Sequence, residues 1–110
     1  MRFARFAVVL RSRARLLPPD SSAPIFEEAL HELADMARYS LTEEAAVVRH
    51  ALSGIMGFDP KQPYELAQLD ALSDTTIRRL DVLIEVVTDG TWGDKLLRDA
   101  LRPALLRRVQ

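Results

Sequence analysis

The sequence predicts an all-α protein, an irregular bundle of five to six short helices in a single domain that spans residues 1–110. Three observations support this class. Apolar residues recur with the helical period of three to four along most of the chain. Short stretches rich in Pro, Ser, Asp and Gly separate these periodic segments. The chain has 110 residues and an apolar content of 48%, which is enough to bury one core without disulfide or metal support.

The N-terminal segment, residues 1–17, is basic and amphipathic. It contains no acidic residue, and its apolar residues form one helical stripe: Phe3, Phe6, Ala7, Leu10, Ala14 and Leu17. Five arginines fall largely off that stripe: Arg2, Arg5, Arg11, Arg13 and Arg15. We therefore expect a helix that docks through its apolar stripe. A strand through residues 3–10 is the alternative that periodicity leaves open.

Two further helices are expected before the midpoint of the chain. The first runs to about Tyr39 and buries an apolar face made of Phe26, Leu30, Leu33 and Ala37. Its opposite face is polar and holds Glu27, Glu28, His31, Glu32 and Asp35. The second begins at a capping box, Ser40 to Glu43, and ends near residues 54–57. It turns Ala45, Val48, Leu52 and Ile55 inward.

Residues 63–89 are predicted to form a central helix pair. Ser73 is a suitable N-cap for the second helix, and Gly90 provides a stop after Asp89. One narrow polar stripe runs along that helix and consists of Asp74, Arg78, Asp81, Glu85 and Thr88. The rest of its surface is apolar, which is typical of a helix packed on several sides. The β-branched residues in 82–87 leave a short buried strand as the alternative.

After this pair, a turn containing Trp92 is expected to begin a last helix, which Pro103 kinks or restarts. Trp92 either covers the end of the core or anchors an interface.

Charge is distributed unevenly although the net charge is only −1. Residues 1–17 and 91–110 are basic, whereas residues 18–90 hold fourteen acidic and five basic side chains. The basic ends either pack on the acidic middle or meet a polyanion. The longest apolar run is residues 6–10, so we expect no membrane association and a cytoplasmic location. Arginine outnumbers lysine thirteen to two, which is typical of a GC-rich bacterial gene.

The sequence contains no recognisable catalytic constellation. Cysteine is absent, and Glu28 and His31 form a single Glu-x-x-His unit, whereas a di-iron bundle requires two. His50, the other histidine, has Val47 in place of the second glutamate. Glycines are scattered rather than gathered in a phosphate-binding loop. We therefore expect no enzymatic activity, no metal and no cofactor.

Residues 66–81, LAQLDALSDTTIRRLD, resemble the helix-turn-helix of bacterial DNA-binding regulators, whose common form is L-A-x-x-x-G-V-S-x-x-T-I. The matching residues are Leu66, Ala67, Ser73, Thr76 and Ile77. Ala71 stands in place of the turn glycine, and Asp74 places an acid where the motif meets phosphates. The resemblance implies a recognition helix whose contact residues are Ser73, Asp74, Thr75, Thr76, Arg78 and Arg79. A capped junction between two ordinary helices is the alternative explanation of the same pattern.

Two classes of function therefore follow for a small helical regulatory protein that acts by binding. In the first, it is a DNA-binding regulator that reads DNA through residues 74–79. The arginines of residues 1–17 would then contact phosphate: Arg2, Arg5, Arg11, Arg13 and Arg15. In the second, it is an adaptor, inhibitor or modulator that binds a protein partner, with no DNA contact. A homodimer is compatible with both classes.

Overall fold

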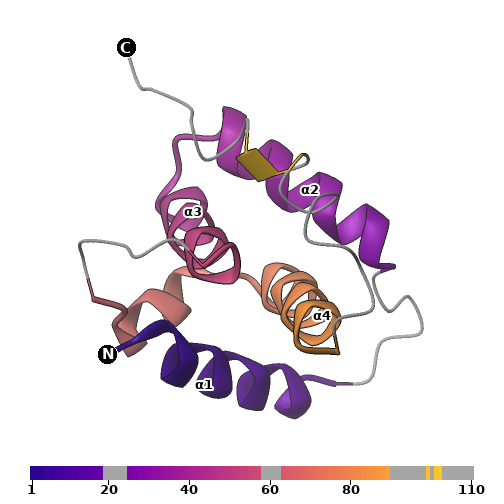
Figure 1. Cartoon of the computed structure of the whole chain (residues 1–110). Helices are drawn as coiled ribbons and strands as arrows, with labels where there is room; N and C mark the ends of the chain where they lie inside the picture. Colours follow the sequence, from indigo (N-terminus) through magenta and orange to yellow (C-terminus); the bar gives the residue numbers. More distant parts are fainter. Residues whose placement is uncertain (19–24, 58–62, 90–98, 100, 103–110) are drawn as a thin grey trace.

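A computed structural model of the chain describes residues 1–18, 25–57, 63–89, 99 and 101–102. Within these residues every regular element is a helix, and the all-α class is confirmed (Figure 1). The elements, in chain order, are α1 (Phe3–Leu16), α2 (Phe26–Tyr39), α3 (Glu43–Ile55), a 3₁₀ helix η1 (Leu66–Ala71) and α4 (Asp74–Asp89).

Both segments for which a strand remained possible are helical. Residues 3–10 lie within α1, and residues 82–87 lie within α4. The predicted apolar stripe of α1 faces the core, with Phe6 and Leu10 fully buried. The predicted faces of α2 are also confirmed, since its four inward apolar residues are buried and its acidic residues are exposed.

Helix α4 lies at the centre of the molecule, as its narrow polar stripe predicted. It packs against α1, α2 and α3, and Leu80 and Leu83 have no exposed surface. Figure 1 shows α1 and α2 on opposite sides of α4. The outer faces of α1 and α2 consequently point away from each other.

The beginning of the central helix pair differs from an ordinary α-helix. Residues 66–71 form the 3₁₀ helix η1, and Leu72 then adopts an extended conformation with φ −92° and ψ 135°. The Gln68 side chain accepts a hydrogen bond from the Glu65 amide at 3.0 Å and thereby closes the first turn. Such short, tight helices are common as connectors. The predicted central helix pair therefore consists of a short 3₁₀ connector, η1, followed by the core helix α4.

The predicted cap of α3 was wrong by two residues. Helix α3 begins at Glu43, and the Thr42 hydroxyl accepts the Ala45 amide at 3.1 Å. Ser40 instead ends α2, where its amide bonds to the Met36 carbonyl. Two hydroxyl residues separated only by Leu41 are available for one cap, and the Ser40 backbone already ends the preceding helix.

Tyr64 fastens the start of η1 to the rest of the fold. Its ring lies edge-on to Phe3 with centroids 5.4 Å apart and stacks on His50 at 3.8 Å. Its hydroxyl donates to the His50 carbonyl at 2.6 Å. Gly54 permits this approach, because a Cβ there would lie 2.2 Å from the Phe3 ring and 2.6 Å from the Tyr64 hydroxyl.

The last predicted helix lies largely outside the described residues, as does Trp92. Residues 99, 101 and 102 are helical, and Leu101 is fully buried among the core residues. This part of the chain therefore adds at least one side chain to the core.

Candidate interaction surfaces

The six residues predicted to contact DNA are divided between surface and core. Ser73, Asp74 and Thr75 are exposed at the start of α4, whereas Arg78 and Arg79 are half-buried. Thr76 is buried, and its hydroxyl lies 3.1 Å from the Ser73 hydroxyl. The predicted Ser73 cap is confirmed, since Ser73 Oγ accepts the Thr76 amide at 3.3 Å. Of these six residues, only Ser73, Asp74 and Thr75, at the start of α4, are therefore fully open to the surroundings.

Helix α1 and the residues after it cover the next two turns of the polar stripe on α4. Arg11 Nε donates to Asp81 Oδ1 at 2.9 Å, and both side chains are about three-quarters buried, with 26% and 25% exposed. Arg78 Nη2 donates to the Pro18 carbonyl at 2.7 Å. The middle of the stripe therefore joins two helices of the same molecule.

The turn between η1 and α4 differs from the turn of the helix-turn-helix motif that residues 66–81 resemble. In the motif the residue at the place of Ala71 requires a left-handed backbone, which is costly for alanine. Among the described residues only Gly57 has a positive φ, and Ala71 therefore does not adopt that conformation. The chain instead passes from η1 to α4 through the extended Leu72.

The five N-terminal arginines separate into two groups. Arg11 and Arg13 bind carboxylates of the same molecule, Asp81 at 2.9 Å and Asp70 at 3.0 Å. Arg2, Arg5 and Arg15 are exposed, and the described residues contain no salt bridge to them. Two arginines of the N-terminal segment thus neutralise carboxylates of the acidic middle, and the other three present their charge at the surface.

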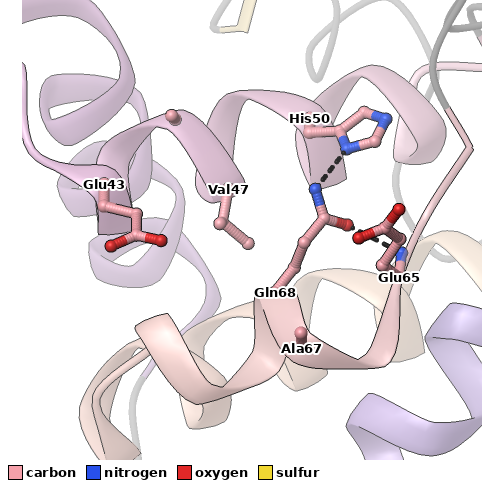
Figure 2. Close-up of a pocket in the computed structure, with 7 residues that line it drawn as sticks. Glu43, Val47, His50, Glu65, Ala67 and Gln68 are labelled. Carbon is pink, nitrogen blue, oxygen red and sulfur yellow. Dashed lines mark hydrogen bonds between the residues drawn. The ribbon is translucent and has the colours of Figure 1, made fainter.

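A shallow groove of about 350 Å³ separates α3 from η1. Figure 2 shows Gln68 between the two walls, with its amide nitrogen 3.0 Å from His50 Nδ1. Glu43 and Glu65 also line the groove, and small apolar side chains complete its surface. The Gln68 amide uses its oxygen on the Glu65 backbone and its nitrogen on His50. These polar groups therefore hold η1 against α3.

The exposed face of α2 is the most acidic surface on any one helix. We define the α2 outer face as the exposed residues Glu27, Glu28, Glu32, Asp35 and Tyr39. The exposed His31 and Arg38 lie among them, and the Arg38 guanidinium lies 5.2 Å from the centroid of the Tyr39 ring. None of its four carboxylates forms a salt bridge within the described residues. Large apolar side chains are exposed at its two ends: Ile25 (62%), Tyr39 (66%) and Leu41 (72%).

On the other side of the molecule, α1 has an exposed face of opposite charge. We define the α1 outer face as the exposed residues Arg2, Arg5, Val8, Ser12, Arg15 and Leu16. Val8 is 65% exposed and lies between the first two arginines and the third. Both outer faces thus combine exposed apolar surface with charges that form no salt bridge in the part of the chain that the structure describes.

No group of three or more His, Asp or Glu side chains in the described part of the chain is arranged to hold a metal ion. Glu28 and His31, the Glu-x-x-His unit, lie exposed on α2. None of the helices in these ranges has both the length and the apolarity needed to cross a bilayer.

Comparisons of the chain with protein-family models, with curated protein sequences and with solved structures found no match.

Several residues that organise these surfaces were not identified from the sequence. Arg49 donates to the Ala37 and Ser40 carbonyls, both at 3.1 Å, and so closes the end of α2. The Glu44 carboxylate accepts the Ser73 amide at 2.5 Å and binds α3 to the start of α4. Arg49 could have been found from the sequence, because an arginine on the half-buried side of a short helix usually requires a hydrogen-bond acceptor nearby. Glu44 has no comparable signal, because its partner is 29 residues away in the chain.

Proposed function

We propose that this protein acts by binding another protein through the α2 outer face, and that the partner presents a basic surface. The supporting observation is the set of four exposed carboxylates on one helix, none of them in a salt bridge within the described residues. These four carboxylates outnumber the single exposed arginine of the helix, Arg38, so the face is negative on balance. A surface with an excess of one charge attracts a surface of the opposite sign and speeds association.

The apolar residues at the ends of α2 support a protein partner over simple solvation. A solvated acidic face has no need of exposed Ile25, Tyr39 and Leu41. Tyrosine is enriched at the core of protein interfaces, where its ring supplies contact area and its hydroxyl supplies a hydrogen bond. Mixed acidic and apolar character therefore fits a partner with both basic and apolar side chains.

A DNA-binding regulator is the second candidate. The Ser73 cap and the exposed Arg2, Arg5 and Arg15 favour it. Its test is the affinity for promoter-proximal DNA of the protein's own locus, which should be salt-sensitive and weakened by Arg78→Ala and Arg79→Ala. Affinity unaffected by both substitutions would exclude residues 74–79 from DNA recognition. The enclosure of the α4 stripe by α1 favours the protein-binding function.

Affinity purification of the full chain at native expression tests the protein-binding function. The test variant combines Glu28→Gln, Glu32→Gln and Asp35→Asn, which removes charge from the α2 outer face and keeps side-chain size. The control variant combines Glu43→Gln, Asp74→Asn and Glu85→Gln, which removes the same charge from exposed residues of α3 and α4.

A stoichiometric partner should be recovered with the wild type and the control, and its yield should fall about tenfold or more with the test variant. Equal recovery of the same partner with the test variant would overturn the assignment to α2.

A further inference from the structure

We propose that the basic surface recognised by the α2 outer face is the α1 outer face of a second copy of this chain. The inference rests on the proposed function and names the partner. The two faces carry opposite net charge, with three arginines on α1 and four carboxylates against Arg38 on α2. These arginines and carboxylates take no part in the salt bridges of the described residues.

The two faces cannot satisfy each other within one molecule. Helices α1 and α2 lie on opposite sides of α4 (Figure 1), and α4 packs extensively against both. Arg11 and Arg13, the arginines that turn inward, already bind Asp81 and Asp70. The outward arginines therefore meet carboxylates of α2 only on another copy.

The two helices also match in length. Each has 14 residues, which corresponds to roughly 21 Å. Arg5 and Arg15 are separated by roughly 15 Å along α1, and Glu27 and Asp35 by roughly 12 Å along α2. Long arginine side chains cover the difference, because their apolar stems can lie along a surface while the charged group reaches its partner. Val8 lies between Arg5 and Arg15 and supplies apolar contact.

This contact is heterologous, since different faces of the two copies meet. A pair with twofold symmetry would need both faces on the same side of the molecule, but they lie on opposite sides. Copies therefore add head to tail and leave one α1 outer face and one α2 outer face free at the ends.

The association should be weak and sensitive to salt. A single pair of helices provides a small interface, and exposed ion pairs contribute only about 0.2–1 kcal/mol each. Salt screens such pairs within about 10 Å at moderate ionic strength. We therefore expect monomers at low concentration or high salt, and head-to-tail oligomers that grow as the concentration of the chain rises and the salt concentration falls.

Sedimentation velocity of the full chain and two variants tests the inference. The first variant combines Arg2→Gln, Arg5→Gln and Arg15→Gln and neutralises the α1 outer face. The second combines Glu28→Gln, Glu32→Gln and Asp35→Asn and neutralises the α2 outer face. All six positions are exposed, and circular dichroism with thermal unfolding confirms that each variant is folded.

Wild-type chain should form oligomers whose size rises with concentration and falls with salt, whereas each variant alone should remain monomeric. An equimolar mixture of the two variants should form a one-to-one complex and grow no further, because the end faces are neutral. Wild type that stays monomeric, variants that still associate, or a mixture without complex would each overturn the second copy as partner. Recovery of a different protein through α2, with monomeric wild type, would leave the proposed function intact and reject only this inference.

Discussion

Tyr64 shows how one side chain connects distant parts of this protein. Its ring contacts Phe3 and Phe6 on α1 and His50 on α3, and its hydroxyl bonds to the backbone of α3. Burial of the hydroxyl raises the pKa of Tyr64 to about 12. Removing the phenolic proton inside the fold is therefore harder than in the unfolded chain.

Alkaline stability should depend on this residue. The unfolded pKa is 10.0 and the folded pKa about 12, so the folded state keeps a proton that the unfolded state loses. The stabilisation is complete below pH 10.0 and decreases as the pH rises to about 12. Tyr64→Phe should abolish this decrease, and the measurement is urea unfolding across that interval. Tyr39→Phe is the control, because Tyr39 is exposed, and it should retain the wild-type slope. An unchanged slope in Tyr64→Phe would contradict the assignment.

At the scale of elements, two ion pairs hold the basic N-terminal segment against the central helix pair. The Arg11–Asp81 side chains are 26% and 25% exposed, whereas Arg13–Asp70 side chains are 39% and 74% exposed. Partial burial strengthens the first pair, while water and salt screen the second. Arg11–Asp81 therefore contributes more to the docking of α1 on α4.

Neutralising the two carboxylates should separate these contributions. Asp81→Asn should lower the free energy of unfolding by about 1 kcal/mol, and Asp70→Asn by about 0.3 kcal/mol or less. Urea unfolding gives both values. In an Arg11→Gln background the cost of Asp81→Asn should largely disappear, as expected for a direct pair. Equal costs for the two carboxylates would contradict the stronger contribution of Arg11–Asp81. A cost of Asp81→Asn that does not depend on Arg11 would contradict a direct pair.

At the scale of the whole molecule, α4 makes the fold cooperative. It packs against three other helices, so its loss removes core contacts from each of them. Leu83 has no exposed surface, while Val87 on the same helix is 37% exposed. Substitutions at these two positions therefore compare the stability cost of truncating a core side chain and a surface side chain within one helix.

Leu83→Ala should lower the free energy of unfolding by about 2–5 kcal/mol, because truncation removes apolar burial and leaves a cavity. Val87→Ala should change it by about 0.5 kcal/mol or less. Circular dichroism and aromatic fluorescence should report one coincident transition during urea unfolding of the wild type and the Leu83 variant. Separate transitions for the two signals would mean that α1 or α2 unfolds independently of α4.

Much of the fold could be predicted because each helix carries its burial pattern locally. Phe6 and Leu10, or Leu30 and Leu33, share one face through the helical period alone. The 3₁₀ form of η1 could not be predicted in this way, because six residues contain too few turns for a period to distinguish helix types. The α3 cap was misplaced because Ser40 and Thr42 are both good caps by composition.

The placement of the candidate site residues depended on contacts that the sequence pattern does not contain. Residues 74–79 have the spacing of a recognition helix, but spacing cannot show that Thr76 is buried or that Pro18 accepts a hydrogen bond from Arg78. The five N-terminal arginines likewise look alike in sequence. Their separation into paired and exposed groups follows from the rotation of α1 about its axis as its apolar stripe meets α4.

The sequence by itself determined the helical class, the inward face of each helix and the basic and acidic character of α1 and α2, since these depend on residue type and local period. Only the tertiary structure decided which charges are paired and which face outward. Arg11 and Asp81 are 70 residues apart in the chain, and their meeting depends on how α1 packs on α4. The same packing places the two charged outer faces on opposite sides of the molecule, where only another molecule can bring them together.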